Sequence, residues 1–176
     1  MERRHFIKLA GLTAIGVAGI PVCARAAEGQ GGWRWCKKCE GLWFADGGDD
    51  RKGKCPAGDA HDATDSGKYV VTQNNDDAPG QQGWRWCKKC EGLWFADGGD
   101  DRKGKCPAGD AHDSTDSGKY VLTHNNDDAP GQKGWRWCKK CEGLWFADGG
   151  GDRKGKCPAR GDHQQEESGN YTLEME

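Results

Sequence analysis

The chain has 176 residues, with 26 basic and 28 acidic side chains and a formal net charge of −2. Its 29 glycines and six prolines make up about a fifth of the residues, which favours turns over long helices. Nine tryptophans and ten cysteines accompany few aliphatic residues, which excludes one large aliphatic core. This composition is typical of small units cross-linked by disulfides or metal ions, with aromatic side chains filling their interiors.

Residues 1–26 have the organisation of a secretory signal peptide. A charged start with the pair Arg3 and Arg4 precedes an uncharged stretch at 9–22 and a small-residue cleavage pattern. The arginine pair and the residues after it resemble the bacterial twin-arginine signal. The uncharged stretch of 14 residues is short for a membrane span. We therefore expect export by the twin-arginine pathway, a periplasmic or secreted protein, and no membrane span after cleavage.

Signal cleavage changes the charge of the chain. Residues 1–26 contain four basic and one acidic side chain, so the mature part has 22 basic and 27 acidic side chains and a net charge of −5. Nucleic-acid-binding domains normally carry a strong positive excess. The charge therefore argues against nucleic acid as a partner.

Three copies of a 51-residue unit fill the rest of the chain. The phrase Trp-Arg-Trp-Cys-Lys-Lys-Cys-Glu-Gly-Leu-Trp-Phe begins at Trp33, Trp84 and Trp135. A fixed period of this length indicates an array of small modules. We divide the mature chain into an N-terminal linker (27–32), repeat 1 (33–83), repeat 2 (84–134) and repeat 3 (135–176).

The second half of repeat 3 differs from the other two copies, and few positions keep their identity. The neighbours of His163 are unlike those of His112, yet His163 still follows Cys157 with the five-residue gap that separates Cys106 from His112. This comparison within one chain singles out the histidine.

Each repeat predicts short strands and no helix. Residues 33–35 and 42–44 alternate with period two, and residues 36–41 predict the tight turn of a hairpin between them. Residues 69–72 predict a third strand, and the turn-rich stretch 74–80 leads to the next repeat. We therefore predict an all-β fold of three tandem, metal-stabilised, zinc-ribbon-like hairpin modules. The sequence leaves open whether they stand as separate beads or close around a pseudo-threefold axis.

Every repeat carries the pattern Cys-x2-Cys-x15-Cys-x5-His. Three thiolates and one imidazole form a complete tetrahedral ligand set for structural zinc. A unit with so little aliphatic surface gains little from its core, whereas a structural zinc contributes roughly 10–16 kcal/mol. We predict about one zinc ion per repeat, held by Cys36, Cys39, Cys55 and His61, by Cys87, Cys90, Cys106 and His112, and by Cys138, Cys141, Cys157 and His163.

Other roles for these cysteines stay open. Export to an oxidising space favours disulfides, but three cysteines per repeat cannot all pair. A redox Cys-x-x-Cys normally lies at a helix N-terminus, and the flanks here predict strands. The ligand set also resembles the cluster of the mitochondrial CDGSH iron–sulfur proteins, which implies an iron–sulfur alternative. That family, however, uses Cys-x-Cys and a three-residue gap before its histidine.

The tryptophans divide between two faces of the predicted hairpin. Trp33 and Trp35 share one face, and we expect them to pack inward around the metal site with Leu42, Phe44 and Tyr69. Trp43 and its equivalents take the opposite face, where exposed indoles beside arginines would be three platforms for sugar rings, with avidity from their repetition. The candidate ligand-binding residues are Arg34, Trp43, Arg85, Trp94, Arg136 and Trp145.

These features predict a non-catalytic binding module, with a polysaccharide or cell-envelope glycan as the leading ligand. An enzyme is disfavoured because repeat 3 has Gln164 at the position of Asp62 in the triad-like set Ser66, His61 and Asp62. A four-ligand metal site also has no position for a catalytic water. A purely structural or interaction protein of the cell envelope is the main alternative. A nucleic-acid-binding or iron–sulfur protein comes behind it.

The phrases Trp-Arg-Trp-Cys-Lys-Lys-Cys-Glu-Gly-Leu and Cys-Pro-Ala-Gly-x-x-His are similar to repeats in secreted bacterial proteins. The resemblance covers residues 33–173. It implies export and the repeat boundaries, and it implies no activity.

Overall fold

The computed structural model describes residues 29–48, 50–99, 101–150 and 152–176. The predicted signal peptide lies outside these residues. Among them there is no helix that is long and apolar enough to cross a membrane. The described strands are β1 (Gly29–Trp35), β2 (Leu42–Phe44), β3 (Lys68–Gln73), β4 (Gln81–Trp86), β5 (Leu93–Phe95), β6 (Tyr120–His124), β7 (Gln132–Trp137), β8 (Leu144–Phe146) and β9 (Tyr171–Met175).

Each repeat contributes the same three strands, as predicted. In repeat 1, β1 and β2 form an antiparallel hairpin in which Trp35 lies opposite Leu42. The turn between them closes where the N–H of Cys36 donates to the carbonyl of Gly41, with Glu40 in the left-handed region at φ 63°. The strands predicted at 33–35, 42–44 and 69–72 are confirmed. Strand β1 begins earlier, at Gly29, within the stretch expected to be a linker.

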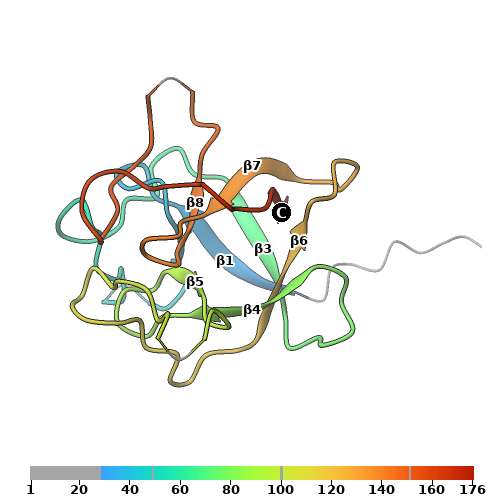
Figure 1. Cartoon of the computed structure of the whole chain (residues 1–176), viewed down its shortest axis with the longest axis horizontal. Helices are drawn as coiled ribbons and strands as arrows, with labels where there is room; N and C mark the ends of the chain where they lie inside the picture. Colours follow the sequence, from blue (N-terminus) through green and yellow to red (C-terminus); the bar gives the residue numbers. More distant parts are fainter. Residues whose placement is uncertain (1–28, 49, 100, 151) are drawn as a thin grey trace, which may run out of the picture.

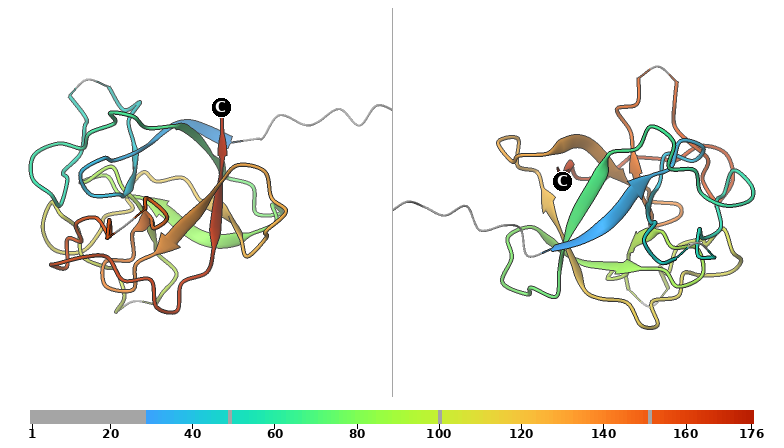
Figure 2. Two further views of the ribbon diagram at one scale, coloured as in Figure 1. Left: turned by 90° about the horizontal axis from the view of Figure 1, so that it is seen from above. Right: turned by 180° about the vertical axis from the view of Figure 1, so that it is seen from behind.

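The three repeats close on one another instead of standing as separate beads. The third strands pair in all three combinations, β3 with β6, β6 with β9 and β3 with β9. At the hairpins, single bridges join Gly41 to Trp145, Trp43 to Gly92 and Trp94 to Gly143. Every repeat therefore contacts both others in an equivalent way, around a pseudo-threefold axis. In Figure 1, β3 and β6 lie near the C-terminus; Figure 2 gives two further views.

One aromatic core is shared by the three repeats. Trp33, Trp84 and Trp135 are fully buried, and each meets a tyrosine of another repeat edge to face. The ring of Trp33, for example, lies 5.3 Å from that of Tyr120 at 87°. Because the core forms only when three units combine their aromatic side chains, closure offsets the scarcity of aliphatic residues.

The inward positions of Trp33, Leu42 and Tyr69 are confirmed, while Trp35 and Phe44 lie half-buried at the edge of this core. The expectation that these side chains surround the metal site is wrong. The cysteines instead cluster with Trp43 on the opposite face of the hairpin. Strand alternation places Trp43 there, and the long loop after β2 folds back over it.

Candidate metal centres and inter-repeat grooves

The predicted ligands converge in all three repeats, and their four ligand atoms lie within 4.8 Å of one another. In repeat 1 the two atoms Sγ of Cys36 and Sγ of Cys55 are 3.8 Å apart, and Sγ of Cys39 is 3.6 Å from Nδ1 of His61. The same pairs in repeats 2 and 3 are separated by 3.9 Å and 3.6 Å. All nine cysteines of the described residues are buried and none forms a disulfide.

These separations fit a single tetrahedral ion. Zinc–sulfur bonds of about 2.3 Å and zinc–nitrogen bonds of about 2.0 Å at tetrahedral angles place two sulfurs about 3.8 Å apart, and a sulfur and a nitrogen about 3.6 Å apart. A disulfide would instead need sulfurs about 2.05 Å apart. The three sites are therefore built as one-ion centres, and the ligand set suits a soft or borderline divalent metal.

Backbone N–H groups orient the sulfurs. The N–H of Asp62 donates to Sγ of Cys36 and the N–H of Ala57 donates to Sγ of Cys55, each over 3.4 Å. In repeat 3, where Gln164 replaces the aspartate, its N–H still donates to Sγ of Cys138 over 3.4 Å. Because the backbone makes this contact, the side chain beside the histidine is free to vary. Such hydrogen bonds hold metal ligands in their bound orientation.

Protons and a metal ion compete for these sulfurs. Hydrogen bonds from the thiols of Cys39 and Cys55 hold the pKa of Cys36 well below its usual range. The hydrogen bond to Cys36 in turn raises the pKa of Cys55 to about 11 and raises that of Cys39 as well. One sulfur is thus poised as a thiolate, and a cation must displace protons from the other two.

The structure corrects the prediction that Trp43, Trp94 and Trp145 are exposed. Their side chains are only 3%, 3% and 2% exposed. Each indole stacks on the metal-site histidine of its own repeat; the rings of Trp43 and His61 are 5.1 Å apart at 17°. The loop that carries the third and fourth ligands covers the indole, so these tryptophans are walls of the metal centres and offer no open platform.

The neighbouring arginines have local partners. Arg34 lies opposite Trp43 in the β1–β2 register, as strand pairing requires. Its Nη1 donates over 2.8 Å to the carbonyl of Trp33. Arg85 and Arg136 repeat the contact on Trp84 and Trp135.

The histidines of the first two metal centres reach the next repeat. Nε2 of His61 lies 3.1 Å from the carbonyl oxygen of Cys90, and Nε2 of His112 lies 3.1 Å from that of Cys141. With Nδ1 on a metal, Nε2 carries the proton and donates it to the carbonyl. Nε2 of His163 is buried without a partner among the described residues, so the third link is not made.

A buried carboxylate reinforces the same junction. Glu91, directly after the ligand Cys90, is 3% exposed and accepts a 2.7 Å hydrogen bond from the indole of Trp86. Arg51 of the preceding repeat forms an ion pair with Glu91 over 3.1 Å and lies over the Trp86 ring at 5.2 Å. The equivalent sets are Arg102, Glu142 and Trp137, and Arg153, Glu40 and Trp35.

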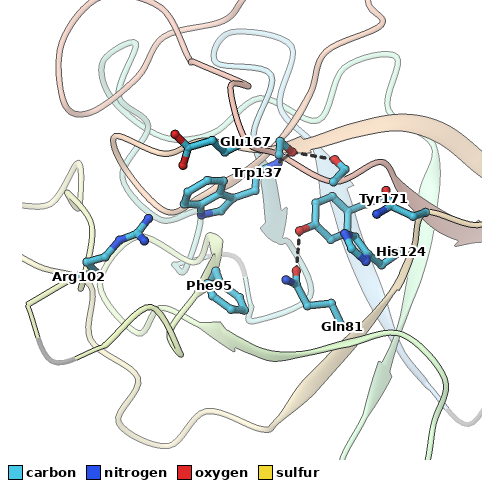
Figure 3. A pocket seen from close by; sticks show the side chains of 10 residues that line it. Gln81, Phe95, Arg102, His124, Trp137, Glu167 and Tyr171 are labelled. Carbon is cyan, nitrogen blue, oxygen red and sulfur yellow. Dashed lines mark hydrogen bonds between the residues drawn. The ribbon is translucent and has the colours of Figure 1, made fainter.

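A groove of about 490 Å³ lies at the junction of repeats 2 and 3 (Figure 3). Its walls combine aromatic rings with amide, imidazole, guanidinium and carboxylate groups. Strand β4 contributes Gln81, which lies just before repeat 2, and repeat 2 contributes Phe95, Arg102 and His124. Repeat 3 contributes Trp137, Glu167 and Tyr171.

The groove has a frame common to the three junctions and one variable wall. The hydroxyl of Tyr171 donates to Oε1 of Gln81, and burial raises the pKa of Tyr171 to about 12, which keeps this hydroxyl a donor at neutral pH. The His124 ring lies 5.1 Å from the Tyr171 ring. His124 also lies against Gly169 of repeat 3. At the other two junctions, Gln73 lies against Gly118 and Met175 lies against Gly67 in the equivalent places.

Sequence reasoning did not find this groove. The signal that could have found it is the period itself, because Gln30, Gln81 and Gln132 recur every 51 residues outside the metal motif. So do Arg51, Arg102 and Arg153. Neither set has a role within its own hairpin, which points to contacts between repeats.

Fold and site together define a class: an all-β protein of three repeats, closed around an axis, with one cysteine–histidine metal centre per repeat. Comparisons with protein-family models, with curated proteins and with solved structures find no match to this chain.

Proposed function

We propose that this is an exported, non-catalytic binding protein in which three structural zinc ions support ligand-binding grooves between the repeats. Carbohydrates, such as a polysaccharide or a cell-envelope glycan, are the leading ligand class. Export is inferred from the twin-arginine-like pattern of residues 1–26. Zinc is inferred from the ligand set and from the sulfur and nitrogen separations, which suit a closed four-ligand site.

A closed site supports a structural role for the ion. Three sulfurs and one ring nitrogen complete a tetrahedral shell, so no coordination position remains for a substrate or a catalytic water. The ligand atoms gather within 4.8 Å, a spacing suited to one ion, which favours zinc over an iron–sulfur cluster. The binding function must therefore lie elsewhere on the surface.

The groove of Figure 3 is the observation that carries the proposal. Sugars present apolar ring faces and a rim of hydroxyls, and the groove offers both kinds of partner. The ring of Phe95 is half-buried, and Gln81, His124 and Glu167 bring hydrogen-bonding groups to the same space. Equivalent frames at three junctions would multiply a weak single-site affinity through avidity.

The main alternative is a structural or interaction protein of the cell envelope, with grooves that hold no small ligand. Nucleic acid is a weaker alternative, because the mature chain carries a net charge of −5. The two experiments below separate the metal part of the proposal from the ligand part.

Elemental analysis and native mass spectrometry of the exported protein test the metal part. We expect three zinc ions per chain, and we expect a chelator to remove them together with the native fold. A metal-free chain that keeps its fold would refute the structural role of zinc.

A glycan array, followed by titration of tryptophan fluorescence with the best glycan, tests the groove. The double variant His124→Ala/Glu167→Ala should lose about tenfold or more in affinity at this junction. Gln82→Ala/Glu166→Ala is the matched control, since both residues are exposed neighbours that do not line the groove. Absence of any saturable glycan would favour the structural alternative, and equal loss in both double variants would reject the groove as the site.

A further inference from the structure

A second hollow lies on the pseudo-threefold axis, at the end where the third-ligand loops meet. Its volume is about 590 Å³, and equivalent residues of all three repeats line it. We name it the axial basin. It is lined by Lys54, Lys105, Lys156 and Arg160, by Pro56, Pro107 and Pro158, and by the adjoining cysteines and glycines.

The charge of the axial basin is opposite to that of the protein. Four lining residues are cationic and none is acidic, whereas the mature chain carries a net charge of −5. Lys54, Lys105, Lys156 and Arg160 are exposed and form no ion pair within the described part of the chain. Positive charge is therefore concentrated at one end of the axis without internal carboxylate partners.

Three further lysines border the basin. Nζ of Lys38 donates to the carbonyl of Gly58 over 2.8 Å, and Lys89 donates to that of Gly109 over 2.7 Å. Lys140 makes the equivalent 2.7 Å contact with the carbonyl of Arg160. These three carbonyls belong to residues that line the basin. The ammonium groups are thereby held near its rim.

Negative charge nearby offsets this excess only in part. Asp59, Asp110 and Asp162 each directly follow a lining glycine, and each zinc site with three thiolates and a neutral imidazole has a net charge of −1. Seven cations against six negative charges leave a positive surplus of one. Repeat 3 supplies this surplus, because Arg160 stands where repeat 2 has Gly109.

The lining also indicates the type of anion. It contains no aromatic side chain, so the base stacking that supports single-stranded nucleic acid binding is missing. The three prolines also line a smaller apolar cavity of about 50 Å³ together with Leu42, Leu93 and Leu144, so the interior beyond them is apolar. A site of this size with cations on three sides suits a compact ligand with charges around its circumference.

We propose that the axial basin binds a compact polyanion that carries at least three sulfate or phosphate groups on one small ring. Lys54, Lys105 and Lys156 would contact one anionic group each, and Arg160 could engage a group with two parallel hydrogen bonds. This site is distinct from the inter-repeat grooves, so it does not depend on the proposed glycan function.

Calorimetric titration of the zinc-loaded protein with myo-inositol hexasulfate tests the proposal. Neutral myo-inositol is the ligand control, and zinc content is measured afterwards. We expect saturable binding of the hexasulfate only, weakened by raising the salt concentration. The variant Lys54→Gln/Lys105→Gln/Lys156→Gln should bind about tenfold or more weakly. The matched control is Lys52→Gln/Lys103→Gln/Lys154→Gln, which removes the same charge from residues that do not line the basin.

A second titration with inositol hexaphosphate identifies the anionic group. If one of the two compounds binds more tightly and this binding is lost only in Lys54→Gln/Lys105→Gln/Lys156→Gln, the result supports the site. It also shows whether the site prefers sulfate or phosphate groups. Equal weakening in both triple variants would show a general charge effect and overturn the proposal. A lack of saturable hexasulfate binding would also overturn it. The same holds if duplex DNA displaces the hexasulfate and binds both triple variants more weakly. Unchanged hexasulfate binding in His124→Ala/Glu167→Ala would separate the basin from the groove.

Discussion

Nε2 of His61 lies 3.1 Å from the carbonyl oxygen of Cys90, and this contact joins a ligand of the first metal centre to a ligand of the second. A histidine that binds zinc through Nδ1 must present N–H at Nε2, so metal binding in repeat 1 sets the donor that repeat 2 accepts. The ion pair of Arg51 with Glu91 joins the same two repeats one residue further along.

Zinc loading should therefore be cooperative. Independent identical sites at half-saturation would place about three quarters of the molecules in states with one or two ions. Because closure of one junction needs ordered centres on both sides, we expect the zero-ion and three-ion states to dominate in native mass spectra of half-loaded protein. The variant Cys90→Ser should lose zinc from more than its own site. A binomial distribution of ions would contradict this coupling.

Gly155 should tolerate no side chain. Its φ is +62°, and a Cβ placed on it would lie 2.2 Å from the carbonyl oxygen of Cys39 in repeat 1. Gly161 is the matched control, since its φ is +64° and a Cβ added there would have no neighbour within 4 Å. Gly161→Ala should cost about 1 kcal/mol from backbone strain alone, whereas Gly155→Ala should cost several times more. Denaturant unfolding of both variants measures the difference, and equal losses would show that the junction is not tightly packed.

Trp94→Ala should damage stability and zinc retention, with no specific effect on ligand binding. The indole is 3% exposed and stacks on His112 at 5.1 Å, so its removal leaves a cavity beside the metal centre. Buried tryptophan-to-alanine substitutions typically cost about 3–5 kcal/mol. Thermal unfolding and metal analysis check the loss, with Trp94→Phe as the milder variant. A stable, zinc-loaded Trp94→Ala protein that had lost glycan binding would restore the idea of an exposed platform.

Zinc affinity should fall steeply in acid. Without metal the pKa of Cys55 is raised to about 11 and that of Cys39 is raised too, so both thiols hold their protons at pH 7. Zinc binding must release about two protons per site, and the apparent Kd should rise about a hundredfold for each unit of pH lowered. Calorimetry at pH 7 in buffers of different ionisation heat counts the protons. A binding heat that is independent of the buffer would contradict this mechanism.

Local sequence patterns predicted the parts that depend on neighbouring residues. The hairpin follows from alternation on either side of the turn at 36–41, and the four ligands follow from spacing that repeats three times. The face of Trp43 was also predictable, since strand geometry places it opposite Leu42. The burial of that face was not predictable. The loop covers it only when the cysteine and histidine of the loop reach the metal centre.

The sequence alone determined the number of units, their strands, their ligand sets and the shortage of aliphatic residues. Only the tertiary structure decided that the repeats close around one axis, that Trp43 is a wall instead of a platform, and that a groove forms where Arg102 reaches Trp137. The physical reason is that near-identical repeats encode the same local structure whether they stand apart or together. Contacts between repeats, such as Trp33 against Tyr120, arise between residues far apart in the chain, and the period alone does not say which of these residues meet.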